Sequence, residues 1–184
     1  MVEPDAICKL LEALDTLDNK LALAGYGKVE IRIVGDFALI IHGIRDTGFT
    51  QDIDSMTRDF DPFVKQLIAE TGLELGLKLG WLNADMVLDD PGVIELIIGE
   101  TLFEDYGDYQ ALDVKVADLS TLLKLKIVAA GDTILVHDDI EHRRHARDLV
   151  ALLKAFGIES AEALIEVAPI AKEYPELLQV LFPS

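Results

Sequence analysis

Cysteines and long apolar runs are almost missing from this chain, and both absences limit what the protein can be. Its 184 residues include one cysteine, Cys8, which excludes an internal disulfide and a cysteine-based metal cage. The apolar stretches around Phe37–Ile44 and Leu119–Ala130 are broken by polar residues and fall short of the ~20 residues of a membrane-spanning helix. The first residues, Met1–Asp5, lack the basic and apolar segments of a signal peptide. We therefore expect a cytoplasmic protein without membrane association.

Positive charge is also scarce. The chain has 16 Lys and Arg against 34 Asp and Glu, which gives a formal net charge of −18. Nucleic-acid surfaces rely on clustered Lys and Arg to neutralise phosphates, and the one dense basic cluster, Arg143, Arg144 and Arg147, lies in an acidic segment. The composition therefore argues against a broad nucleic-acid surface. A small nucleotide in a local pocket is still compatible with it, because a bound metal ion can offset nearby carboxylates.

Low-complexity sequence and flexible linkers are absent as well. Apolar residues make up 51% of the chain, with only 13 Gly and 6 Pro, which is the composition of a globular protein and not of a disordered one. The length suits one domain. We expect a single domain over residues 1–184, with an α/β core over residues 28–116 and a helical part over residues 117–184.

Hydrophobic periodicity predicts alternating helices and strands in the first half of the chain. The N-terminal segment repeats leucine and isoleucine at three and four residues, whereas the next segment alternates apolar and polar side chains. The expected elements are a helix over Pro4–Ala24, a strand over Val29–Val34, a helix over Phe37–His42, a strand over Thr50–Met56 and a helix from Asp61.

The second half is expected to begin with a loop over Gly72–Gly80, a short helix or turn over Trp81–Leu88, a buried strand over Val93–Ile98 and an alternating strand over Leu112–Val116. Helices follow over Leu119–Ala130, His137–Phe156, Ala161–Val167 and Pro169–Leu181, with breaks at Gly131-Asp132 and Gly157. The fold class is therefore α/β (α+β): a small mixed sheet with an N-terminal helix and a helical C-terminal half.

The chemically informative segment runs from Gly35 to Asp54. Gly35 joins a predicted strand to a predicted helix, and such a turn directs free backbone N–H groups to an anion above the strand. Asp52 and Asp54 are two residues apart on the next predicted strand, so their side chains leave the same face. Two carboxylates on one face repel unless a cation or a proton lies between them. Oxygen ligands favour Mg²⁺ or Mn²⁺, and the combination is typical of a metal–nucleotide site.

This pattern resembles the nucleotidyltransferase superfamily, and more narrowly the AbiEii-toxin-type nucleotidyltransferases. A strand, a glycine turn, a short helix and an Asp-x-Asp strand follow one another in that order. The matching residues are Ala38, His42, Gly43, Arg45, Thr50, Asp52 and Asp54. Weaker similarities lie at Trp81-Leu82-Asn83, at the Lys124–Lys126 stretch and at Arg147-Asp148, so that the resemblance covers roughly residues 28–155.

The resemblance implies a nucleotidyltransferase-type sheet and a site for an NTP with Mg²⁺ or Mn²⁺. Asp52 and Asp54 would be the metal ligands and catalytic carboxylates. The residues expected near the nucleotide are Gly35, Asp36, Arg45, Thr50, Lys126 and Arg147. For Lys126 an apolar-helix lysine that reaches solvent is the alternative, and for Arg147 it is an ordinary ion pair. A solvated, turn-adjacent acidic pair is the alternative for Asp52 and Asp54.

Asp36 departs from the family pattern, which has Gly or Ser at this position. A carboxylate beside a triphosphate would repel it. A structural explanation is that Asp36 caps the Phe37–His42 helix, which contributes ~1 kcal/mol. Both interpretations are compatible with a retained fold whose nucleotide site is altered or lost.

A third carboxylate is expected on a neighbouring strand as a metal ligand or general base. Glu95 is the first choice because it is the one charged residue within Val93–Ile98, and Asp113 is the second. Either is equally compatible with an outward-facing strand residue. A separate group of His and acidic residues over residues 137–145 permits a transition-metal site, against the simpler interpretation of a surface helix with i,i+4 pairs.

Three functions from different classes follow. The first is a nucleotidyltransferase acting on an NTP and an unknown acceptor, in a bacterial toxin–antitoxin or defence context by resemblance alone. The second is a catalytically degenerate module that acts through a protein partner or as a homodimer. The apolar residues over Ala161–Leu181 give that second hypothesis an interface. The third is a phosphohydrolase that uses the same carboxylates with water as acceptor.

Overall fold

The computed structural model describes residues 5–45, 50–84, 91–135 and 139–183. Within these ranges the chain is a mixed α/β protein with a five-stranded mixed sheet in the order β3-β2-β1-β5-β4. The strands are β1 (Val29–Val34), β2 (Ile53–Ser55), β3 (Leu82–Asn83), β4 (Phe103–Asp105) and β5 (Leu112–Ala117). β1 pairs in parallel with β5 and antiparallel with β2, while β2 and β3 are parallel and β4 and β5 antiparallel.

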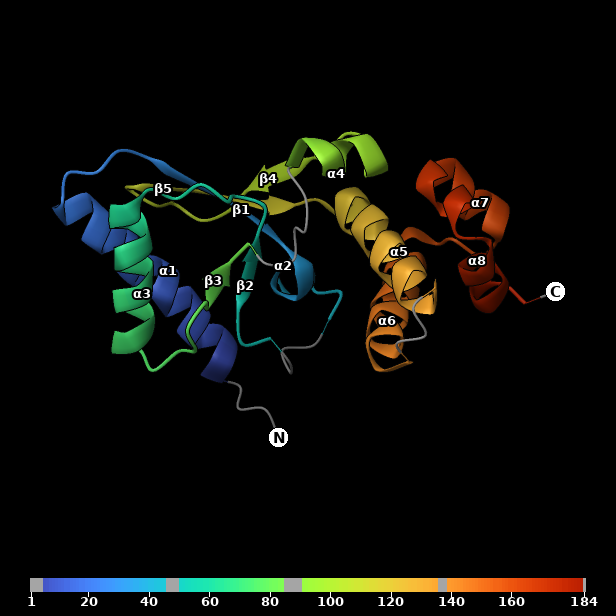
Figure 1. The fold of residues 1–184 in the computed structure, drawn as a ribbon, viewed down its shortest axis with the longest axis horizontal. Helices are drawn as coiled ribbons and strands as arrows, with labels where there is room; N and C mark the ends of the chain where they lie inside the picture. Colours follow the sequence, from blue (N-terminus) through green and yellow to red (C-terminus); the bar gives the residue numbers. More distant parts are fainter. Residues whose placement is uncertain (1–4, 46–49, 85–90, 136–138, 184) are drawn as a thin grey trace.

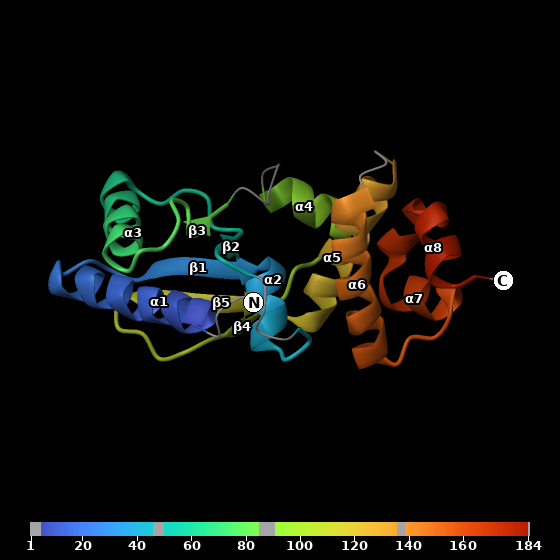
Figure 2. The ribbon, with the colours of Figure 1, turned by 90° about the horizontal axis from the view of Figure 1, so that it is seen from below.

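The helices accompanying the sheet are α1 (Asp5–Leu23), α2 (Gly35–Ile41), α3 (Pro62–Glu74) and α4 (Pro91–Ile98). Those of the C-terminal half are α5 (Leu119–Leu135), α6 (Asp139–Phe156), α7 (Ala161–Val167), the 3₁₀ helix η1 (Pro169–Glu173) and α8 (Pro175–Leu181). Figure 1 shows α1 and α3 on one side of the sheet and α4 on the other. In Figures 1 and 2 the C-terminal helices gather at one end of the sheet, with α5 and α6 side by side.

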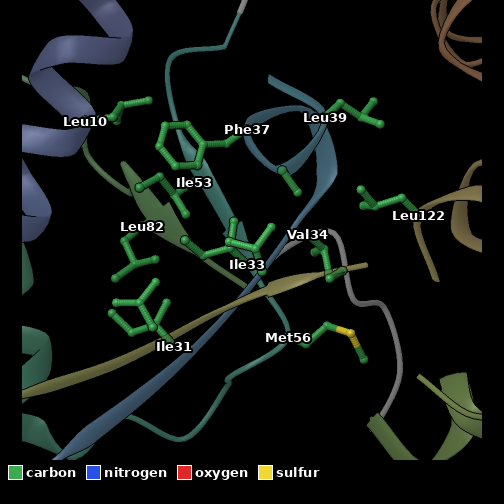
Figure 3. Close-up of a cluster of buried hydrophobic side chains, with 14 of the residues drawn as sticks. Leu10, Ile31, Ile33, Val34, Phe37, Leu39, Ile53, Met56, Leu82 and Leu122 are labelled. Carbon is green, nitrogen blue, oxygen red and sulfur yellow. The ribbon is translucent and has the colours of Figure 1, made fainter. Parts of the chain in front are cut away.

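β1 lies at the centre of the sheet with β5 beside it, and both strands alternate buried and half-buried residues over their first five positions. Val29, Ile31 and Ile33 are buried on β1, and Val114 and Val116 are buried on β5. The intervening residues are half-buried, so the apolar face of each strand turns to the same layer of helices. Figure 3 shows the resulting contacts, where β1 side chains meet those of α1, α2, β2, β3 and α5.

A buried carboxylate fastens α1 to the sheet. Asp18 is 8% exposed and accepts backbone N–H bonds from Gln110, Ala111 and Leu112 at 2.7–3.0 Å. These N–H donors lie just before β5 or at its first residue, where, within the described ranges, they do not have a hydrogen-bond acceptor on a neighbouring strand. One charged acceptor satisfies all three donors, of which those of Ala111 and Leu112 are buried, so α1 is fixed to the edge from which β5 begins.

Most predicted elements are confirmed, and three predictions are wrong. The segment Val93–Ile98 lies in α4 and not in a strand, and Leu82–Asn83 is a strand where a helix or turn was expected. α5 also continues through Gly131-Asp132, the expected break. Pro169–Leu181 divides into η1 and α8, while β4 had no prediction.

The apolar residues of the last helices are largely used within the chain. Leu164, Ala168, Ala171 and Leu177 are each at most 1% exposed and belong to the same core cluster as the sheet residues. The apolar character of Ala161–Leu181 therefore needs no partner surface to explain it. No helix in the described ranges combines the length and apolar character needed to cross a bilayer.

Candidate functional site

Gly35 and Asp54 meet where β1 passes into α2. Gly35 has φ +69°, a left-handed conformation that glycine adopts without steric penalty. A Cβ added at Gly35 would overlap the Asp54 Oδ2 atom. The β1–β2 register explains this approach, because Asp54 is paired with Val34, the last residue of β1. The structure therefore places one of the two expected acids directly at the glycine bend.

Asp52 lies just before β2 and is held by two neighbours. Its carboxylate forms an ion pair with Lys78 and accepts a hydrogen bond from Thr50 Oγ1 at 3.3 Å. The same hydroxyl lies 2.9 Å from the Asp52 backbone oxygen. Thr50, which was expected near the nucleotide, is 3% exposed and therefore positions Asp52 from within the protein. Lys78 had no predicted role, because it falls in a segment that was expected to be a loop.

The two acids influence each other electrostatically. Burial raises the pKa of Asp54 to about 6, and the negative charges of Asp52 and Asp36 add to the effect, whereas Lys126 and a hydrogen bond from Asn83 oppose it. Asp54 is 8% exposed, so its charge is poorly solvated. Near neutral pH it remains a carboxylate but is close to taking up a proton. A carboxylate in this condition gains from any cation brought beside it.

Asp36 is not a helix cap. α2 begins at Gly35 with Val34 as its N-cap residue, and no side chain caps it. The Asp36 carboxylate instead lies among three cations: Lys126 Nζ at 2.9 Å, Arg144 Nη2 at 2.6 Å and Arg45. The capping explanation is wrong because a cap at position 36 requires a helix that begins at Phe37, whereas α2 begins two residues earlier, at Gly35.

A second buried acid completes this group. Asp148, on α6, contacts Lys126 Nζ at 2.8 Å and Arg45 Nε at 3.5 Å. We call Asp36, Arg45, Lys126, Arg144 and Asp148 the buried ion cluster. Burial alone would raise the pKa of Asp36, but Lys126 and Arg144 outweigh it and hold that pKa well below its usual range.

The buried ion cluster joins three distant parts of the chain. α2 supplies one acid, α5 the lysine and α6 the other acid, with 90 residues between Asp36 and Lys126. Lys126 is 3% exposed, so its ammonium does not reach solvent and the alternative of a solvent-reaching lysine is wrong. Arg147, also expected near the nucleotide, is exposed on α6. It is the neighbouring Asp148 that enters the cluster.

The expected third carboxylate does not come from either candidate strand position. Glu95 was chosen as a strand residue, but it is exposed on α4 and accepts a hydrogen bond from Thr101 at 3.2 Å. Asp113 lies on β5 opposite Glu30, near the start of β1, whereas Asp54 lies opposite Val34 at its end. Glu30 and Val34 are four residues apart along β1, so Asp113 and Asp54 are separated by about 13 Å along the strand direction. The acid whose charge does reach Asp54, besides Asp52, is Asp36.

Two further expectations concern histidines. His42 follows α2, and its Nε2 lies 2.9 Å from the Ala117 backbone oxygen, which ties the helix end to β5. Of the proposed transition-metal group, His137 and Asp138 lie outside the described residues. Among the residues described, no three His, Cys, Asp or Glu side chains form a preassembled metal site.

Comparison with protein-family models, with curated proteins and with solved structures finds no match. The family assignment therefore stays a prediction that rests on the motif from Gly35 to Asp54.

Proposed function

We propose that this protein is a nucleotidyltransferase-type enzyme that binds an NTP with Mg²⁺ or Mn²⁺ and transfers a nucleotidyl group to an acceptor. The observation that carries the proposal is the packing of Asp54 against the Gly35 bend, with Asp52 two residues earlier and close enough to raise the pKa of Asp54. Two carboxylates beside a glycine turn that follows a strand are typical of a metal–nucleotide site.

The donor set fits Mg²⁺. Magnesium in nucleotide sites is held by one or two carboxylates together with substrate phosphates, and it keeps several waters. Asp52 and Asp54 would supply those carboxylates. When bound, the ion would neutralise charge on the phosphates and on both acids. The Lys78 ammonium now performs part of that task at Asp52, so Lys78 has to release the carboxylate for the ion to bind.

The charge of the buried ion cluster supports phosphate binding. Its three cations, Arg45, Lys126 and Arg144, exceed its two acids, Asp36 and Asp148, which leaves one positive charge. The Asp36 carboxylate is enclosed by this excess and does not act as an isolated negative group. The repulsion expected between Asp36 and a triphosphate is thereby offset. Arg144, with 45% of its side chain exposed, is the cation of the cluster closest to solvent.

Isothermal titration of Mg²⁺–ATP and Mg²⁺–GTP tests the site. The wild type should bind one of them, and Asp52→Asn/Asp54→Asn should lose at least ten-fold in affinity, because the amide oxygens are weaker ligands for the ion. Asp113→Asn is the matched control, since it removes an acid of the same sheet that lies opposite Glu30, at the other end of β1 from Asp54. This variant should bind as the wild type does. Equal affinities for the wild type and the double variant would remove the proposed site.

A second function has an observation of its own. Lys126 and Arg45, which the family resemblance assigns to the nucleotide, each contact both Asp36 and Asp148. A site whose cations are already neutralised fits a degenerate module that acts through a protein partner. Incubation with α-labelled NTPs distinguishes the two. Labelled product and pyrophosphate from the wild type support the enzyme, whereas label that appears only with Asp36→Gly supports the degenerate module. Release of inorganic phosphate instead would indicate hydrolysis.

A further inference from the structure

A pocket of about 380 Å³ lies between α3, the segment leading to β3 and the residues that follow β2. Its walls are largely apolar, with Ile68 and Leu73 from α3, and Leu77 and Trp81 from the segment after it. This volume is in the range of small-molecule sites, about 300–1,000 Å³. Neither acid of the pair and no member of the buried ion cluster belongs to its lining, but Lys78, which forms an ion pair with Asp52, does. The pocket therefore adjoins the site described above and has a lining of its own.

The wall of the pocket is built from fixed contacts. Trp81 is 1% exposed and its Nε1 donates a hydrogen bond to the Ile68 backbone oxygen at 2.8 Å. The indole edge packs on Gly72, where an added Cβ would lie 2.5 Å from Trp81 Cδ1. The Trp81 backbone oxygen accepts from Ile53 N at 2.6 Å, which ties the wall to β2. The inner wall of the pocket is therefore fixed by the fold, whereas residues 78–80 form an exposed rim.

The charge of the lining is opposite to that of the chain. Sixteen described residues line the pocket, and none of these sixteen is acidic, while Arg58, Lys65 and Lys78 are basic. With 34 acidic residues in 184, the chain average would place about three acids among sixteen positions. The pocket thus concentrates positive charge in a protein with a net charge of −18. Such a concentration favours an anionic ligand.

Arg58 supplies the most specific indication. Its Nη2 atom is buried and has no hydrogen-bond partner among the described residues. A guanidinium keeps its charge at any physiological pH and has five N–H donors, and buried donors without a partner are rare because they cost free energy. Lys78, also in the lining, already shares its ammonium with Asp52. Arg58 is therefore the lining cation with a donor left over for an acidic group of a ligand, and a rotation of its side chain would bring that donor to the pocket.

We propose that this pocket binds a small organic anion, with an apolar body against Trp81 and its neighbours and with one acidic group on Arg58. This inference does not rest on the proposed nucleotidyl transfer, since it uses neither Asp54 nor a metal, and the two sites share only Lys78 at their border.

Two fluorescent probes of nearly the same shape test the proposal. 8-Anilinonaphthalene-1-sulfonate carries an acidic group, and N-phenyl-1-naphthylamine lacks it. The sulfonate probe should saturate at one site per wild-type chain and bind more tightly than the neutral one. Arg58→Gln should weaken the sulfonate probe by about ten- to a hundred-fold, the range expected for a charged hydrogen bond, and change the neutral probe less than two-fold.

Three further variants protect the test against misfolding. Arg58→Lys keeps the charge and should retain most of the affinity for the sulfonate probe. Ala69→Phe, at an exposed position of the lining on α3, should obstruct both probes. Lys154→Gln removes an exposed cation from α6 and should change neither. Unchanged sulfonate binding in Arg58→Gln, or an equal loss of both probes with the circular dichroism melt preserved, would overturn the proposal.

Discussion

Replacement of Lys126 by Met tests the energetic role of the buried ion cluster. Lys126 contacts Asp36 at 2.9 Å and Asp148 at 2.8 Å, and all three side chains are at most 4% exposed. Met has a similar volume, so the change removes the charge without opening a large cavity. Loss of one partner from a buried ion pair costs about 3–5 kcal/mol, because the remaining charge stays buried.

The two acids lose unequal support in Lys126→Met. Asp36 keeps Arg45 and Arg144, whereas Asp148 keeps only the longer contact to Arg45 Nε at 3.5 Å within the cluster. We therefore expect the lower end of the range, about 3 kcal/mol. For a chain of this length that corresponds to a fall of about 6–12 °C in Tm. Urea denaturation followed by far-UV circular dichroism measures the free energy of unfolding.

Two further variants separate charge from packing. Lys126→Met/Asp148→Asn removes the stranded carboxylate and should recover at least half of the loss, as a double-mutant cycle would show. Lys124→Met, on the same helix, gives up only a hydrogen bond to the Glu100 backbone oxygen at 3.0 Å and should cost less than about 1 kcal/mol. A Lys126→Met protein as stable as the wild type, or a double variant no better than the single one, would refute the reasoning.

The pH dependence has a defined sign. The pKa of Asp36 is held well below its usual range in the folded protein, so its stabilising contribution is present above the unfolded pKa near 3.8 and is lost only as pH falls through the folded pKa. The deficit of Lys126→Met should accordingly persist between pH 8 and pH 5. It should shrink below about pH 4, where the unpaired carboxylates take up protons.

Three more substitutions give measurable outcomes. Gly35→Ala should lower the free energy of unfolding by about 2–4 kcal/mol, since the new Cβ overlaps Asp54 and the backbone is left-handed. Gly25→Ala, with φ +66° and open space around it, should lower it by only about 1–2 kcal/mol. Equal losses in urea denaturation would contradict the close approach of Asp54 to Gly35. Asp54→Asn should stabilise the metal-free protein by about 1–3 kcal/mol at pH 7, because the folded pKa of about 6 makes stability fall as pH rises from about 4 to 6. A flat wild-type profile over that interval would count against this. Gly131→Ala should lower Tm by several degrees through overlap with the Tyr174 ring, and it would leave Tm unchanged only if that ring moves freely.

Local patterns predicted the elements that have a distinct signal. β1 and β5 alternate strictly, and α1 and α3 show helical spacing, with Asp61 accepting a cap bond from Val64 N at 3.0 Å. The segment Val93–Ile98 failed because a short apolar run has the same appearance in a buried strand and in a helix. Whether such a run forms a strand or a helix depends on the surface against which it packs. Glu95 was assigned to a strand for the same reason.

The sequence by itself determined a mixed α/β fold, a glycine bend after β1 and an acid, Asp54, on the following strand with Asp52 just before it, because glycine's freedom of φ and the two-residue period of a strand are local properties. The tertiary structure decided that Asp36 joins Lys126 and Asp148 and does not cap a helix. These partners come from α2, α5 and α6, and the energy of a buried charge depends on what surrounds it in space. No spacing along the chain records which helices will pack together.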